Sequence, residues 1–270
     1  MTRLKDFFSR LVNIIRSPAM LLLPGNLAFF IVLAIFPILT LLGVIISFFG
    51  MSLDISFLSN ALPKNIVDIL SPYILGKGFD SNVGFFMIIG FIMASNGADA
   101  IILASNSLYE IPNTGFIKRR IKDFLIILLI IFIFVFLLAI FTFGNLIFKF
   151  LLNYVSVDYI TALYKAFLLL RWPFAVFIIY FNVKLIYVLA PDSKIKRKTT
   201  TEGAIFTTIA WSISTAIFTY YVKHFSNYDI FYGSLSNIIV LILWIYILSY
   251  ILVIGIAINV GKDKKEEINE

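Results

Sequence analysis

The residues that could do chemistry in this chain are concentrated in the segment 91–110, which reads FIMASNGADAIILASNSLYE. It holds Ser95, Asn96, Asp99 and Asn106 in a protein that is 61% hydrophobic and only 14% charged. On a helix of 3.6 residues per turn, these four side chains fall on roughly a third of the circumference. A loop has no reason to sort its polar residues in this way. We therefore expect a helix with one polar face turned away from lipid.

Asp99 is the costly member of this face, because an acid at the centre of a membrane helix costs roughly 2.5–3.5 kcal/mol and usually faces a bundle interior or a water-filled cavity. Lys184, in the apolar segment 167–190, is expected at a similar depth from the same membrane surface. We expect Asp99 and Lys184 to pair, directly or through Asn182, in a polar cavity near the inner surface. The alternative is that Lys184 extends to the interface and that Asn and Ser neighbours hold Asp99. The candidate polar site comprises Asn96, Asp99, Asn106, Asn182 and Lys184.

The elements that must position this site are predicted to be membrane helices. Ordinary soluble domains are about half apolar and a quarter charged, whereas this chain has half that charge and a mean hydropathy of +0.99. A hydrocarbon core of about 30 Å needs about 20 apolar helical residues, and continuous apolar runs are untypical of a membrane β-barrel. The sequence thus predicts an all-α integral membrane protein with six transmembrane helices, at about 26–50, 83–107, 121–148, 167–190, 203–223 and 235–260.

The Lys and Arg residues give the orientation of these helices. Fifteen lie in the N-terminal segment, the connections after the second and fourth spans, and the tail, and five lie in the alternate connections. Because cytoplasmic loops carry the excess of Lys and Arg, both termini are predicted to be cytoplasmic. Topology explains the basic charge, so no nucleic-acid partner is expected. The cluster of Lys194, Lys196, Arg197 and Lys198 is interpreted as a topology anchor, with binding of anionic lipid headgroups as the alternative.

The remaining segments surround a transmembrane domain at 25–260. Residues 1–24 are predicted to form an amphipathic helix on the inner leaflet, and 261–270 a charged cytoplasmic tail. Pro37 is expected to kink the first span, since it removes a backbone hydrogen bond. Contacts at the outer interface are expected from Arg171, Trp172 and Tyr232. Membrane lipids are the expected partners, and the sequence is also compatible with a homo-oligomer.

The sequence lacks the residues and motifs that most enzyme chemistry needs. The chain has no cysteine and one histidine, His224. It contains no Walker A loop, no His-Glu-x-x-His and no Gly-x-Ser-x-Gly. Hydrolysis assisted by a metal needs clustered carboxylate or imidazole ligands, and the acidic pair Glu266-Glu267 lies in the tail. We therefore expect no catalytic residue, no metal site, no cofactor and no enzymatic activity.

Five stretches carry a resemblance to a known family. They read LPGNLAFFIVLAIFPILTLLG, LAPDSKIKRK, EGAIFTTIAWS, YGSLSNIIVLILWIY and GIAIN. In this order they resemble the YihY/BrkB family of bacterial inner-membrane proteins, some of which were once labelled ribonuclease BN. The resemblance covers about 24–260 and implies six spans in the bacterial plasma membrane. It implies no settled activity, since the family is described as virulence-associated or as transporters.

Two positions depart from the family pattern. The family usually has Pro-Gly-Ala where this chain has Glu202-Gly203-Ala204, and a glutamate where this chain has Ala257. If that glutamate carries a proton or contacts a substrate in the family, this member lacks it. We expect a transporter or a lipid-handling protein with a polar inner cavity between the second and fourth spans. The alternative is a membrane scaffold or assembly protein whose polar face binds a partner helix.

Overall fold

The computed structural model describes residues 20, 22–33, 81–138, 157–224 and 236–268. Within these ranges all regular secondary structure is α-helical, as the sequence predicts. A short apolar helix spans Leu22–Leu33. The five long helices are α5 (Ser81–Tyr109), α6 (Phe116–Leu138), α8 (Val157–Leu189), α9 (Thr200–His224) and α11 (Ser236–Ile268).

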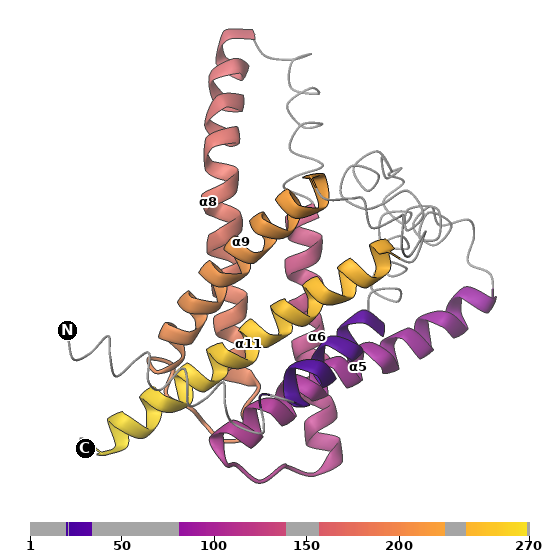
Figure 1. The fold of residues 1–270 in the computed structure, drawn as a ribbon, viewed down its shortest axis with the longest axis vertical. Coiled ribbons are helices and arrows are strands. Elements are labelled where there is room, and N and C mark those ends of the chain that lie inside the picture. The colour runs from indigo at the N-terminus through magenta and orange to yellow at the C-terminus, as the bar shows by residue number, and fades with distance from the viewer. Residues whose placement is uncertain (1–19, 21, 34–80, 139–156, 225–235, 269–270) are drawn as a thin grey trace.

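The five long helices pack in a closed ring. Each helix packs on the next in chain order, and α11 returns to pack on α5. Figure 1 shows α6 and α8 running upright and α5, α9 and α11 crossing them obliquely, with the α5–α6 turn, the α8–α9 connection and the end of α11 toward the lower side. The short helix packs on α5 at a glycine, since a Cβ at Gly97 would lie 3.6 Å from Phe30. In this ring α6 therefore lies between α5 and α8.

Three of the described helices are long and apolar enough to cross a membrane by length and composition: Tyr164–Leu189, Thr200–Tyr221 and Ile239–Lys262. Their outward faces are strongly hydrophobic. Along α9, for example, an exposed stripe with a spacing of four residues is formed by Ile205, Ile209, Ile213 and Ile217. Water would penalise an apolar surface of this extent, whereas acyl chains match it.

The predicted spans correspond to helices wherever the structure describes them, with different ends. The largest difference is in α8, which begins at Val157 instead of 167. With 33 residues it is about 50 Å long, which exceeds a hydrocarbon core of about 30 Å. Arg171 and Trp172 thus lie near the middle of the helix and not at its start, about 27 Å from Leu189. Residues 1–19, Pro37 and Tyr232 lie outside the described residues.

Glycine permits a close approach between α9 and α11. A Cβ at Gly203 would overlap the carbonyl of Gly255, and a Cβ at Gly255 would overlap the side chains of Thr207 and Tyr187. The Tyr187 hydroxyl lies 2.6 Å from Thr207 Oγ1 and donates to the Leu252 carbonyl at 2.9 Å. Small residues at a crossing let backbones approach closely, so this crossing binds α8, α9 and α11 together.

Asn259 completes the crossing by capping a neighbouring helix. Its Oδ1 accepts a hydrogen bond of 2.8 Å from the backbone N–H of Gly203. That N–H belongs to the first turn of α9, where backbone donors have no partner within their own helix. A residue of α11 thereby takes the role that an N-cap side chain usually takes from the same helix.

Replacing Gly255 by alanine should open this crossing. The added methyl group would collide with Tyr187 and Thr207, so we expect the free energy of unfolding to fall by about 1–3 kcal/mol. Thermal unfolding of the purified protein in detergent measures the change. The matched control is Gly261→Ala, because a Cβ at Gly261 meets nothing within 4 Å. Equal melting temperatures for the two variants would contradict the close approach.

Candidate functional site

A buried carboxylate just after the end of α8 gathers donors from three other segments. Oδ1 of Asp192 lies 2.7 Å from Lys122 Nζ, and its Oδ2 accepts from Asn106 Nδ2 at 2.8 Å and from the Thr114 backbone N–H at 2.9 Å. Lys122 also donates to the Pro191 carbonyl at 2.6 Å. The Asp192 side chain is only 1% exposed. Asp192 therefore ties the end of α8 to α5, to the α5–α6 turn and to α6.

The α5–α6 turn is shaped to bring these donors together. Glu110 adopts a left-handed conformation with φ of 59°, and the Ile111 N–H donates to the Asn106 carbonyl at 2.9 Å. This is the bonding pattern of a Schellman helix end, at which glycine is more usual than glutamate. The Asn106 side chain contacts both sides of the turn. Its Nδ2 donates to Asn113 Oδ1 at 2.9 Å, and its Oδ1 accepts from the Asp192 backbone N–H at 2.9 Å.

These donors set the ionisation of Asp192. Burial alone would raise the pKa of this carboxyl, but the hydrogen bonds from Lys122, from the Thr114 backbone and from Asn106 outweigh burial. They hold the pKa of Asp192 well below its usual range. The group is therefore a fixed negative charge at neutral pH, and it pairs with the partly buried ammonium of Lys122.

A second ionic cluster joins the polar face of α5 to α6. Arg119 Nε lies 2.6 Å from Asp99 Oδ1, in a contact whose geometry is that of an ion pair and not of an aligned hydrogen bond. The side chains of Arg119 and Asp99 are 23% and 17% exposed. Asp99 lies one helical turn after Ser95 on α5 and is therefore paired across the α5–α6 interface.

The same interface holds Arg120 and Asp123, which sequence reasoning did not include in the site. Arg120 donates to Ser95 Oγ at 2.7 Å and lies 3.4 Å from Asn96 Oδ1. It also lies 3.3 Å from Asp123 Oδ2 and 5.2 Å from the centre of the Phe116 ring. Asp123 is fully buried. Ser95 and Asn96 are thus partners of an arginine that the charge pattern identified only as a topology marker.

The expected pairing of Asp99 with Lys184 does not occur, because α6 lies between α5 and α8 and supplies Arg119 to Asp99. Lys184 lies 5.9 Å from the Tyr180 ring on its own helix. Asn182 is buried and donates to the Ile178 carbonyl at 3.0 Å, also within α8. Of the five predicted site residues, the structure brings Asn96 and Asp99 together at α6 and places Asn106 at Asp192.

Of the other predicted positions, the structure describes Arg171, which is half-buried, Trp172 and the basic cluster. Trp172 is exposed, and the Arg171 guanidinium lies 6.0 Å from the centre of its ring. The four basic residues of the α8–α9 connection, Lys194, Lys196, Arg197 and Lys198, are also exposed. Among the described residues, no group of three or more His, Cys, Asp and Glu side chains could hold a metal ion.

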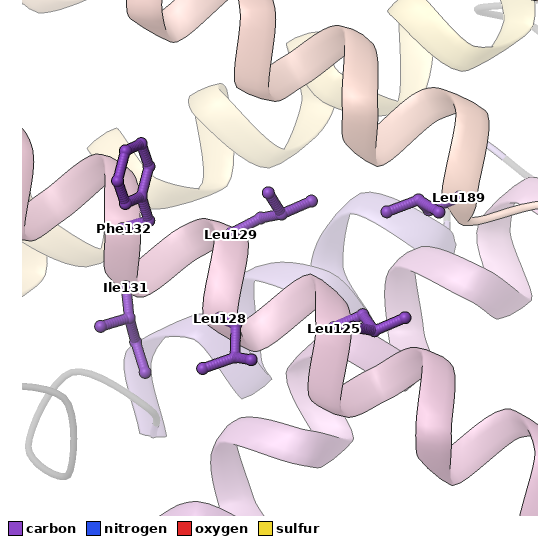
Figure 2. Close-up of a pocket in the computed structure, with 6 residues that line it drawn as sticks. All are labelled: Leu125, Leu128, Leu129, Ile131, Phe132 and Leu189. Atoms are coloured by element: carbon purple, nitrogen blue, oxygen red, sulfur yellow. The ribbon is translucent and has the colours of Figure 1, made fainter.

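An apolar hollow lies beside the Lys122–Asp192 contact. It has a volume of about 520 Å³ and is lined by Leu125, Leu128, Leu129, Ile131, Phe132 and Leu189. Figure 2 shows Leu129 pointing from α6 toward α8, with Leu189 at the end of α8. A purely aliphatic and aromatic lining suits an acyl chain. An apolar surface that could contact lipid therefore lies close to the charged Lys122–Asp192 contact.

Replacing Asp192 by asparagine should loosen the contacts among the end of α5, the start of α6 and the end of α8. Removing one partner of a buried pair leaves the other uncompensated, so we expect the free energy of unfolding at neutral pH to fall by about 3 kcal/mol. Thermal unfolding in detergent measures it. The control is Glu202→Gln, which breaks the exposed Glu202–Lys262 pair and should cost less than about 1 kcal/mol.

The same contact predicts a pH dependence. The pKa of Asp192 is lower in the folded than in the unfolded chain. The contribution of Asp192 to the free energy of unfolding is therefore complete above the pKa of the unfolded chain, about 3.9, and is lost as the pH falls below that value. The stability difference between wild type and Asp192→Asn should therefore shrink on acidification below about pH 4. A difference that grows at low pH would contradict the assignment.

Comparison with known proteins places these motifs in a family. A family model described as virulence factor BrkB matches residues 17–269. A protein of Bacillus subtilis (strain 168), named as the ribonuclease-like protein YfkH, is 27% identical over 251 residues, which cover 90% of each chain. A UPF0761 membrane protein of Pseudoalteromonas translucida is 31% identical over 91 residues, 34% of this chain and 29% of that protein. Another, from Alteromonas mediterranea, is 36% identical over 70 residues, 26% of this chain and 24% of that protein.

No solved structure matches the chain significantly. The match across nearly the whole sequence shows that this chain belongs to the BrkB family of bacterial membrane proteins.

Proposed function

We propose that this chain is a plasma-membrane protein with six spans and both termini in the cytoplasm. The polar contacts at one end of the ring support this topology. Asp192 joins the inner ends of α5, α6 and α8, and Lys262 of α11 lies 2.6 Å from Glu202 at the start of α9. The same end carries the basic clusters of the first turns of α6 and of the α8–α9 connection. An excess of Lys and Arg marks the cytoplasmic side.

Single cysteines test this topology in a chain that has none of its own. Lys118→Cys and Lys194→Cys are expected to react with a membrane-impermeant thiol reagent only in inside-out vesicles. Lys165→Cys, near the start of α8, is expected to react only in intact cells. All three positions are exposed. Labelling of Lys118→Cys and Lys165→Cys from the same side would contradict the proposal.

The proposed role is that of a transporter or lipid-handling protein whose inner site lies between α5 and α6. The observation that carries it is the Asp99–Arg119 pair, with both side chains partly exposed inside a largely apolar bundle. Ionisable residues within membrane helices are costly and commonly mark substrate or ion pathways. A pair that serves packing alone has no need of access to water.

Phospholipid is the cargo or ligand class that fits best, because apolar and basic surfaces adjoin. The hollow lined by Leu125, Leu129 and Leu189 offers acyl-chain contacts, while the α8–α9 connection offers exposed cations. Clusters of Lys and Arg on the cytoplasmic side attract anionic headgroups. We propose that Lys194, Lys196, Arg197 and Lys198 contact such headgroups.

Lipid movement in proteoliposomes tests the role. The protein would be reconstituted in phosphatidylethanolamine and phosphatidylglycerol with a trace of fluorescent phosphatidylglycerol, and dithionite quenching would report transfer between leaflets. We expect wild type to transfer lipid faster than protein-free vesicles do. For Asp99→Asn we expect a transfer rate about tenfold lower than wild type, which corresponds to a barrier higher by about 1.4 kcal/mol.

The control is Glu202→Gln, which changes an exposed carboxylate at the same end of the ring. Its transfer rate should match wild type. Wild-type transfer equal to that of protein-free vesicles would remove the lipid-handling role. Transfer that Asp99→Asn leaves unchanged would remove the assignment of the site to the α5–α6 interface.

A further inference from the structure

Two aspartate side chains at the same end of the ring are shielded from solvent, and their surroundings differ. The side chains of Asp192 and Asp123 are each 1% exposed. Asp192 receives donors at 2.7, 2.8 and 2.9 Å, shared between both of its oxygens. A buried carboxylate needs such donors, because removing a charge from water without compensation is costly. Asp192 therefore has the surroundings of an ionised group.

Asp123 lacks this compensation. Its Oδ1 is buried and has no hydrogen-bond partner. Its Oδ2 has two long contacts, 3.3 Å from Arg120 Nη1 and 3.5 Å from Ser95 Oγ. Charge-assisted hydrogen bonds between nitrogen and a carboxylate are usually 2.7–2.9 Å long. These distances suit a neutral acceptor better than an anion.

The charged neighbours do not belong to Asp123 alone. On α6, Arg120 makes its shortest contact with Ser95, its side chain is 37% exposed, and it lies over Phe116. Arg119 is engaged by Asp99. From α5 the charged group that faces the cluster is Asp99, whose negative charge raises the cost of a second carboxylate beside it. The cation of the α6–α8 contact, Lys122, is held by Asp192.

We propose that Asp123 is a proton-binding site, whose carboxylate takes up a proton as the pH falls from neutral to mildly acidic values while the α5–α6 interface has the arrangement seen here. The step is a reversible binding of one proton to the Asp123 carboxylate, with no other bond formed or broken. With the proton bound, Asp123 is neutral, Asp99 and Arg119 balance each other, and the Arg120 charge is solvated. With the proton released, the interface holds two carboxylates and Arg120 becomes the counter-charge of Asp123.

Infrared spectroscopy of the full-length purified protein tests this without any assumption about transport. The carbonyl stretch of a protonated carboxyl group is resolved from carboxylate bands. We expect wild type to gain such a band as the pH is lowered from neutral to mildly acidic values, and the Asp123→Asn variant to lack it. The matched control is Asp192→Asn, which should keep the band and lose carboxylate absorption. Absence of any protonated-carboxyl band in wild type overturns the proposal, and that result needs no variant to fold.

A second arm distinguishes a proton site from a carboxyl that is merely buried. In Arg120→Gln the ionised form of Asp123 loses its nearest cation, so the band should persist to a pH higher by about one unit or more. In Asp123→Glu the band should remain at a shifted frequency. A band whose pH midpoint is unchanged in Arg120→Gln overturns the assignment to this cluster. The proposal stands on the geometry of the cluster, so a failed lipid-transfer assay leaves it intact.

Discussion

The need to compensate one buried carboxylate, Asp192, fixes the end of the ring at which α5 ends, α6 begins and α8 ends. Its oxygens are satisfied by Lys122, Asn106 and Thr114, which come from α6, from the end of α5 and from the turn between them. None of these donors could move by the width of a side chain without leaving a buried charge unpaired. The rotation of α6 against α5 is thereby set, and with it the meeting of Arg119 and Arg120 with the polar face of α5.

That rotation explains how an apolar ring tolerates four charged groups on one interface. Asp99 and Arg119 neutralise each other at 2.6 Å, and Arg120 reaches solvent with part of its side chain. Asp123 has neither a dedicated cation nor access to water. The two buried aspartates show that burial alone does not decide whether an acid is a fixed charge. The number and distance of its donors decide it.

The sequence was sufficient for the parts of the fold that depend on one helix at a time. Apolar run length predicted the described helices, and the angular sorting of Ser95, Asn96 and Asp99 predicted a polar face on α5. The sequence alone did not identify the helix that this polar face meets. Depth in the membrane follows from residue counting, but which neighbouring helix a side chain meets depends on the order of helices around the ring. Arg119 and Arg120 carry the same charge signal as any topology marker, so nothing in the pattern distinguished them.

The packing of the helices gives a physical reason for the family motifs. The stretches that contain Gly203 and Gly255 meet at the α9–α11 crossing, where Tyr187 of α8 also binds. The stretch LAPDSKIKRK supplies Asp192 to α5 and α6. Both contacts draw on the last turns of α8, whereas above Asp192 the α6–α8 interface holds an apolar hollow. The α6–α8 interface therefore combines a polar contact at its Asp192 end with an apolar surface beyond it, as the two parts of a phospholipid would require.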